Sequence, residues 1–352
     1  MRVRKAVIPI AGLGTRHFPA SHAVKKEMFP VVGTDGIARA LFHYHLLELE
    51  AAGIEEICLI VQPGEDEMVK KYLRGPDENY LKRLEKYPAL LREAAQMKKF
   101  SERVTFAVQR EQEGYGHAVF QTENFANGEM VLLGLGDHLF RGKPVVTSPS
   151  PPAGERVGVR GHEQSETSLA TKTPPHPAPS PAGGEGGVSV GESVSASPAI
   201  ISPYQELADM ARISGGKSVS AVNRISANEL KGYGTIAGTR RAENQRLIDV
   251  SLIIEKPAVA VAQEKLRVDN LPPQTWLGWF GMHLLAPNIY EILAEMIRDN
   301  VRDNGEFQLT RAQEIQRQRE GYLALEMTGA ERFDFGVPDD FVASVSAFRI
   351  LP

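Results

Sequence analysis

The first 140 residues alternate short, continuously apolar segments with longer segments whose apolar residues recur at helical spacing. "KAVIPIAG" (from Lys5), "EEICLIV" (from Glu55) and "EMVLLGLGD" (from Glu129) have the composition of buried strands. Between the first two, "IARALFHYHLLELEAA" (residues 37–52) has the periodicity of a helix. Continuous apolar strands that alternate with helices are typical of a mostly parallel sheet covered on both faces. We therefore predict an α/β fold.

The composition changes between residues 141 and 203, which contain no aromatic residue, and ten of the 23 prolines of the chain lie between Pro144 and Pro198. Such a segment cannot bury a core, so we predict a disordered insert rich in Pro, Gly and Ser. It contains a quasi-repeat, "PSPPAGERVGV" and "PSPAGGEGGV". The repeat favours an inserted element, and a proline-rich ligand for a partner domain is the alternative. Residues 1–140 and 204–352 are then two parts of one domain.

Length and charge exclude several classes of protein. The 352 residues carry a formal net charge of −4, which gives no reason to expect a nucleic acid or an anionic membrane as partner. No apolar run approaches the roughly 20 residues that a membrane-spanning helix needs, and the apolar part of the N-terminus is short for a secretory signal. The single cysteine, Cys58, lies in an apolar strand segment and is expected to be buried. We expect a cytoplasmic protein, with a homo-oligomer left open.

A glycine-rich loop follows the first predicted strand and reads "AGLGTRHFPASHAVKKEMFPVV" (residues 11–32). Its glycines let backbone N–H groups approach a phosphate, and Arg16, Lys25 and Lys26 supply positive charge. The loop is neither a dinucleotide fingerprint, which needs a third glycine, nor a P-loop, which needs Gly-Lys-Ser/Thr. Taken alone, it fits an anion site or a tight turn with solvated bases equally well.

Five further short segments have to be considered together with this loop. They are "EGYGHAV" (113–119), "LGDHLF" (135–140), "IIEKP" (253–257), "GEFQLT" (305–310) and "FDFG" (333–336). In this order, the six segments resemble the motifs of sugar-1-phosphate nucleotidyltransferases, and most closely those of the bacterial UTP–glucose-1-phosphate uridylyltransferase family. The resemblance covers roughly residues 3–140 and 217–347. It implies a Rossmann-like, mostly parallel mixed sheet of the nucleotide-diphospho-sugar transferase type.

The resemblance also implies a reaction and a set of site residues. A sugar-phosphate oxygen attacks the α-phosphorus of UTP directly, which yields UDP-glucose and pyrophosphate and needs no nucleophilic side chain. Charged groups and Mg²⁺ would stabilise the transferring phosphoryl group. By motif position, the catalytic residues are Arg16, Lys26 and Lys256, the nucleotide-binding residues Ala11, Gly12, Gly14, Thr15, Gln109 and Gly114, the sugar-phosphate-binding residues Gly234, Glu255, Lys256 and Glu306, and the Mg²⁺ ligands Asp137 and Asp334.

The chain departs from the motifs at several places that bear on the substrate. Lys25 stands where the family has a proline, "LGD" replaces "LPD", and Gly281-Met282-His283 replaces a glycine–aromatic element near the sugar. We therefore keep three alternatives: the same reaction with dTTP or another sugar 1-phosphate, a non-catalytic paralogue that binds sugar nucleotides, and a nicotinamide oxidoreductase. The oxidoreductase alternative gives no role to the segments "IIEKP" and "FDFG".

Overall fold

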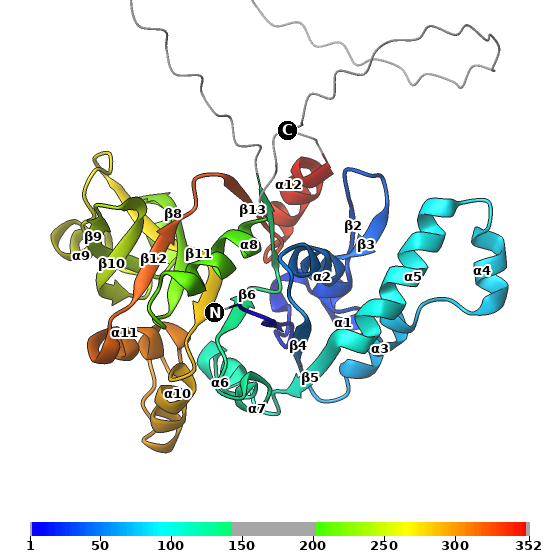
Figure 1. Cartoon of the computed structure of the whole chain (residues 1–352), viewed down its shortest axis with the longest axis horizontal. Helices are drawn as coiled ribbons and strands as arrows, with labels where there is room; N and C mark the ends of the chain where they lie inside the picture. The colour runs from blue at the N-terminus through cyan, green and yellow to red at the C-terminus, as the bar shows by residue number, and fades with distance from the viewer. Residues whose placement is uncertain (1, 143–201, 350–352) are drawn as a thin grey trace, which may run out of the picture. The chain divides into compact units, whose positions relative to one another are not determined.

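The computed structural model describes residues 2–142 and 202–349 (Figure 1). Most of the predicted insert, residues 143–201, lies outside the described residues, and so does the expectation that it is disordered. Both ends of the predicted insert lie in regular structure. Arg141 and Gly142 end strand β7 (His138–Gly142), and Pro203 begins helix α8 (Pro203–Asp209).

A nine-stranded sheet forms the centre of the described residues. Its strands are, in order across the sheet, β5 (Val104–Val108), β4 (Glu56–Val61), β1 (Lys5–Pro9), β6 (Val131–Gly134), β11 (Thr275–Leu285), β8 (Val219–Ser226), β12 (Leu323–Glu326), β10 (Asn244–Ile254) and β9 (Thr235–Arg241).

The sheet is mixed, as predicted, and most of its parallel pairs are formed by strands from the first 140 residues of the chain. Strands β5, β4, β1 and β6 are mutually parallel, and β8 pairs with β12 in parallel. Strand β11 joins the halves by antiparallel pairing with β6 on one side and with β8 on the other. Strands β9 and β10 form an antiparallel hairpin. Parallel neighbours need a crossover connection, and helices α2, α3 and α5 lie in the connections between β1, β4 and β5.

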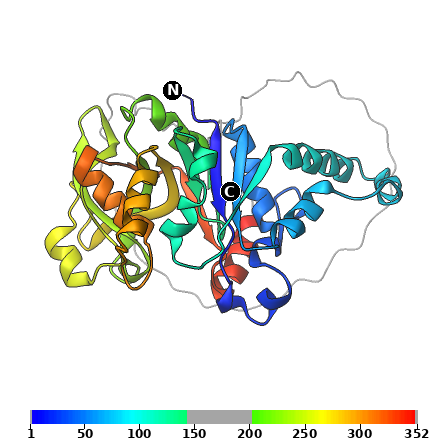
Figure 2. The same cartoon turned by 90° about the horizontal axis from the view of Figure 1, so that it is seen from below.

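Helices cover both faces of the sheet, because successive strand residues enter different apolar clusters. In β1, Ala6 and Ile8 pack in one cluster and Val7 in another. The first cluster includes side chains of α2 (Leu41–Ala51), α3 (Asp66–Arg74), α5 (Pro88–Arg103) and α8. The second includes side chains of α6 (Tyr115–Phe120), α7 (Glu123–Ala126), α10 (Ile289–Arg298) and α11 (Leu309–Glu320). Figure 2 shows helices on both sides of the central strands.

Two short ribbons lie beside the main sheet. In one, β7 pairs antiparallel with β13 (Ala330–Asp334), and helix α12 (Pro338–Arg349) follows. In the other, β2 (Pro30–Val32) pairs with β3 (Ala38–Ala40). The predicted helix over residues 37–52 therefore begins at Leu41, since the three residues before it pair as a strand.

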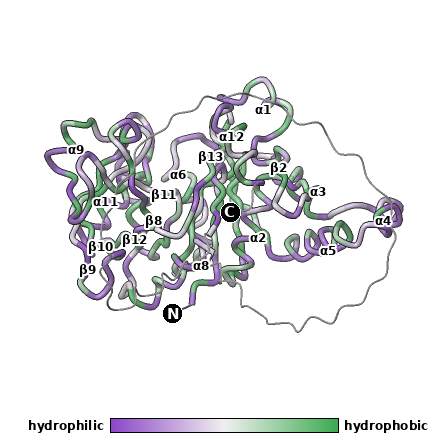
Figure 3. Tube along the Cα trace, turned by 90° about the horizontal axis from the view of Figure 1, so that it is seen from above, coloured by the Kyte–Doolittle hydropathy of each residue, from purple (hydrophilic) through white to green (hydrophobic). Residues whose placement is uncertain are grey.

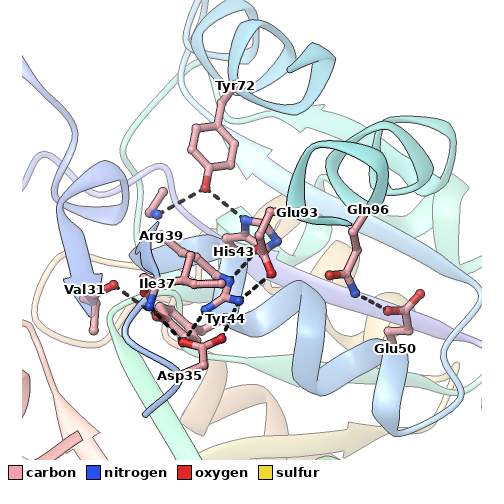
Figure 4. A network of polar contacts seen from close by, with 11 residues as sticks. Val31, Asp35, Ile37, Arg39, His43, Tyr44, Glu50, Tyr72, Glu93 and Gln96 are labelled. Carbon is pink, nitrogen blue, oxygen red and sulfur yellow. Dashed lines mark hydrogen bonds and ion pairs between the residues drawn. The ribbon is translucent and has the colours of Figure 1, made fainter. Parts of the chain in front are cut away.

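A network of hydrogen bonds and ion pairs connects α5 with β3 and the turn that precedes it (Figure 4). The guanidinium of Arg39 donates to Asp35 Oδ2 at 2.7 Å and, through Nε, to Glu93 Oε2 at 2.7 Å. His43 Nδ1 and the Tyr72 hydroxyl are 2.9 Å apart. Arg39 is 7% exposed, and the carboxylates of Asp35 and Glu93 compensate its buried charge.

The remaining helices are short and lie at the periphery: α1 (Ala20–Ala23), α4 (Glu78–Leu84) and α9 (Val259–Lys265). Hydrophobic colour in Figure 3 follows the strands of the sheet, whereas α4 is drawn largely in purple, and α4 has no buried residue. Within residues 2–142 and 202–349, no helix combines the length and the apolar character that crossing a bilayer requires.

Candidate active site

Two cavities meet at one edge of the sheet. The first has a volume of about 480 Å³ and the second about 800 Å³, and Tyr115, Leu135 and Asp137 line both. All six predicted nucleotide-binding residues line the first: Ala11, Gly12, Gly14, Thr15, Gln109 and Gly114. The predicted residues Arg16, Gly234, Glu255, Lys256, Asp137 and Asp334 line the second. Residues far apart in the sequence are thus brought to one place.

Glu306 is placed differently from the prediction. It was assigned to the sugar phosphate, but it lines the first cavity and is not among the residues that line the second. The reason is its packing against Gly114: a Cβ on Gly114, whose φ is 110°, would lie 2.8 Å from Glu306 Cβ. The glycine lets the two segments approach, and this contact holds Glu306 at the first cavity.

The glycine loop is fixed by contacts at both of its ends. Gly14 has φ 62° and ψ 28°, a left-handed conformation that favours glycine, and it begins a short 3-10 helix, Thr15–His17. His17 is buried, and its Nε2 lies 3.0 Å from the Phe335 carbonyl. Gln62 Nε2 donates to the Ala11 carbonyl at 2.8 Å. The loop is therefore ordered before any ligand binds.

The two adjacent lysines have different positions. Lys25 Nζ donates to the Gly12 carbonyl at 2.8 Å and pairs with Glu65 Oε1 at 2.9 Å, so it braces the loop. Lys26 Nζ donates to Asp137 Oδ2 at 2.6 Å and lines the first cavity. Burial lowers the pKa of Lys26, but Asp137 and Glu27 outweigh that effect and raise it above its usual value. Lys26 is thus a permanent cation beside Asp137.

Glu27 is a buried carboxyl that the sequence motifs contain but to which we assigned no role. It is 2% exposed, it lines the first cavity, and its Oε2 makes no hydrogen bond among the described residues. Burial raises the pKa of Glu27 to about 7, although Lys26 opposes the shift. A side chain of this kind can carry a proton near neutral pH.

Asp137 and Asp334, separated by nearly 200 residues, are joined by the β7–β13 ribbon. Asp334 is directly opposite His138 in the register, and Asp137 immediately precedes β7. A Cβ on Gly336 would lie 3.0 Å from both Asp137 Oδ2 and Asp334 Oδ1, so the two carboxylates converge. The Gly336 N–H donates to Asp334 Oδ1 at 2.7 Å.

His138 lies between the two aspartates and was not predicted as a site residue. Its Nδ1 is 2.8 Å from Asp137 Oδ1 and its Nε2 is 3.3 Å from Asp334 Oδ2. Burial lowers the pKa of His138, but the two carboxylates raise it to about 9, so the ring is a cation at neutral pH. Burial raises the pKa of Asp137, and His138 and Lys26 hold it well below its usual range.

These aspartates also fit a hard divalent cation. Convergent carboxylate oxygens are the donors that Mg²⁺ prefers. Among the described residues, no group of three or more His, Cys, Asp or Glu side chains has the arrangement of a metal site. The protein therefore offers two carboxylates to a cation, both currently bonded to protein cations, and the phosphates of a substrate would complete the coordination.

The second cavity contains the "IIEKP" segment at the end of β10. Thr310 Oγ1 donates to Glu255 Oε2 at 2.7 Å. Lys256 has φ 45°, a left-handed conformation that is uncommon outside glycine and often found at binding sites. Its Nζ is 3.4 Å from Glu255 Oε1, and its side chain is 57% exposed. The strained backbone points to a functional constraint on the direction of this lysine.

Comparisons with known proteins show what the chain is similar to. Residues 5–145 match the family model described as nucleotidyl transferase. A UTP–glucose-1-phosphate uridylyltransferase of Staphylococcus saprophyticus is 25% identical over 99% of this chain and 94% of its own length. That of Staphylococcus epidermidis is 24% identical over 99% and 93%.

Solved structures show the same fold. A UDP-glucose pyrophosphorylase in complex with UDP-glucose has a TM-score of 0.65 at 20% identity, over 98% of each chain. The UTP-bound enzyme of Acinetobacter baumannii has a TM-score of 0.65 at 21% identity, over 98% of this chain and 93% of its own. Residues 5–145 thus match the nucleotidyl transferase family model, and the chain over its length is similar to UTP–glucose-1-phosphate uridylyltransferases.

Proposed function

We propose that this enzyme joins UTP and glucose 1-phosphate to give UDP-glucose and pyrophosphate. The observation that carries the proposal is the shared wall of the two cavities, where Lys26 and Asp137 are 2.6 Å apart. A nucleotide in the first cavity and a sugar phosphate in the second would meet at this wall. The names of the relatives support the choice of substrates.

In the proposed reaction, a phosphate oxygen of glucose 1-phosphate attacks the α-phosphorus of UTP. The new P–O bond forms as the bond to pyrophosphate breaks, so the charges balance without a covalent enzyme intermediate. No thiol takes part, since Cys58 is 1% exposed and burial raises its pKa to about 12. The task of the protein is to align two polyanions and to stabilise the charge on the transferring group.

Three cations are available for that task. Lys26 lines the first cavity and contacts Asp137 of the shared wall, whereas Arg16 and Lys256 line the second cavity. Arg16 is exposed, and no hydrogen bond or ion pair of its side chain occurs among the described residues. We assign Lys26 to the transferring phosphoryl group, Arg16 to the triphosphate and Lys256 to the phosphate of the sugar.

Asp137 and Asp334 are the residues that would hold Mg²⁺. Bound there, the ion would neutralise charge on the phosphates of both substrates. His138 and Lys26 pair with these carboxylates in the ligand-free protein and keep both of them ionised. The preformed carboxylate pair is therefore available at neutral pH.

The test is pyrophosphate release from purified protein with Mg²⁺, glucose 1-phosphate and one triphosphate at a time. We expect release with UTP, and less with dTTP, ATP and GTP. A preference for dTTP, or for another sugar 1-phosphate in a parallel panel, would retain the reaction and change the substrate. Folded protein that binds UDP-glucose but releases no pyrophosphate with any pair would instead support the non-catalytic paralogue.

A further inference from the structure

The two tryptophans of the chain lie three residues apart on strand β11 and differ in one respect. Trp276 Nε1 donates to the Ala262 carbonyl at 3.1 Å. Trp279 Nε1 is buried and has no hydrogen-bond partner among the described residues. A buried N–H without an acceptor costs free energy, and such exceptions need an explanation.

Trp279 lines the second cavity, beside Gly234 and Glu255. A Cβ on Gly234 would lie 2.6 Å from Trp279 Nε1 and 2.8 Å from Glu255 Oε2. An unsatisfied donor and a carboxylate acceptor therefore approach the same point. Only glycine leaves room for both atoms. This steric constraint, besides the motif position, explains a glycine at residue 234 in "GYGTI".

The present partners of Glu255 explain why the indole N–H is unused. Thr310 Oγ1 donates to Oε2 at 2.7 Å, and Lys256 Nζ is 3.4 Å from Oε1. The contact to Lys256 is long, and that side chain is 57% exposed, so a phosphate can draw the lysine away at little cost. Glu255 then has no cationic partner, although its carboxylate must accept hydrogen bonds from the hydroxyl groups of the sugar.

We propose that Trp279 is a positioning residue for Glu255: its indole N–H donates to the Glu255 carboxylate once the phosphate of the sugar has drawn Lys256 away. The inference rests on the proposed function, since it assumes a sugar 1-phosphate in the second cavity. The N–H replaces the departed ammonium as a neutral donor and keeps the carboxylate ionised and directed at the sugar.

The matched variants Trp279→Phe and Trp276→Phe test the proposal. Among the described residues, Trp279→Phe removes no hydrogen bond, whereas Trp276→Phe removes one; both shorten a buried ring, so Trp279→Phe should lower the melting temperature less than Trp276→Phe. Its KM for glucose 1-phosphate should rise about tenfold, the effect of one hydrogen bond to a charged group, whereas its KM for UTP and its kcat should stay within about twofold. Trp276→Phe should lower the melting temperature and leave both KM values unchanged. An unchanged KM for glucose 1-phosphate in Trp279→Phe overturns the proposal.

A double-mutant cycle shows whether Trp279 acts through Glu255. In a Glu255→Gln background, Trp279→Phe should raise the KM for glucose 1-phosphate by less than about twofold further. A full additional tenfold rise would mean that the indole acts on its own, and the positioning role would be wrong.

Fluorescence separates this inference from the proposed reaction. In Trp276→Phe the only indole is Trp279, and its emission should change when glucose 1-phosphate is added in the presence of an unreactive UTP analogue. In Trp279→Phe the emission should stay constant. If the wild-type protein releases no pyrophosphate and the Trp279 emission still responds, the proposed function fails and the inference stands. An active protein whose Trp279 emission does not respond overturns the inference alone.

Discussion

The two cavities contrast in how far their charged groups are already paired. In the first, Lys26 is bonded to Asp137, and Lys25, which braces the glycine loop, is bonded to the Gly12 carbonyl and to Glu65. In the second, Lys256 has a single ion-pair contact of 3.4 Å within the described part of the chain. The buried Trp279 N–H there has no acceptor among the same residues.

On the proposed assignment of the cavities, the lysines of the nucleotide side are already paired within the protein, whereas Lys256 on the sugar-phosphate side is paired only weakly. A paired, buried cation has already lost its side-chain freedom, so binding costs little further entropy. An exposed lysine loses that freedom only when the phosphate binds. Substitutions in the first cavity should therefore affect turnover most, and those in the second the binding of the sugar phosphate.

Asp137→Asn should have the largest effect, a loss of about 10³-fold or more in kcat. The substitution keeps the shape of the side chain but removes the charge that Lys26 and His138 share. Pyrophosphate release under saturating substrates is the measurement. Asp249→Asn is the control, because Asp249 on β10 pairs with Arg241 on β9 and lines neither cavity. Turnover near the wild-type level in Asp137→Asn would remove Asp137 from the site.

Lys26→Ala and Lys25→Ala should differ from one another. Lys26→Ala should lower kcat by about 10²–10³-fold, because it removes a charge from the shared wall. Lys25→Ala loosens the glycine loop and should lower kcat by less than about tenfold. Steady-state kinetics with both substrates varied measures the difference. Equal losses of kcat in the two variants would contradict the different roles that we infer for Lys26 and Lys25 from their contacts.

Gly234→Ala should affect the second cavity alone. A Cβ there would lie 2.5 Å from Trp279 Cδ1, so the ring must move, and we expect the KM for glucose 1-phosphate to rise about 10²-fold. Its KM for UTP should hardly change. Gly12→Ala, whose Cβ would meet nothing within 4 Å, is the control and should leave the KM for glucose 1-phosphate unaltered. A matching rise of both KM values in Gly234→Ala would contradict the separation of the cavities.

The smallest expected effect is on stability and concerns His283, which lines the second cavity. Burial lowers the pKa of His283 to about 3, and its Nδ1 lies 2.6 Å from Ser220 Oγ. The folded pKa is below the ordinary 6.5, so this stability is present above pH 6.5 and is lost as the pH falls toward 3.

Between pH 7 and pH 5, the free energy of unfolding should fall by about 2 kcal/mol because of this one imidazole. His283→Asn keeps an acceptor near Ser220 and should remove that part of the pH dependence in urea titrations. His22→Asn, at an exposed position, should leave the pH dependence as in the wild type. A wild-type slope in His283→Asn would mean that the buried ring is not neutral.

Local pattern was enough to predict much of the fold. The apolar segments from Lys5 and Glu55 became β1 and β4, and Cys58 is buried as expected. The start of α2 was predicted too early, because Ala38–Ala40 pairs with Pro30–Val32 in a ribbon. Such pairing is not encoded in the periodicity of either segment.

The sequence by itself determined the chemical inventory of this protein: a glycine loop, its lysines, two aspartates and a Glu-Lys-Pro segment in a recognisable order. Only the tertiary structure decided which lysine faces Asp137, that His138 bridges Asp137 and Asp334, and that Glu306 belongs to the first cavity. It also decided that the Trp279 N–H has no acceptor within residues 2–142 and 202–349. Motifs follow from local residue order, whereas these contacts depend on strand register and side-chain direction across segments far apart in the chain.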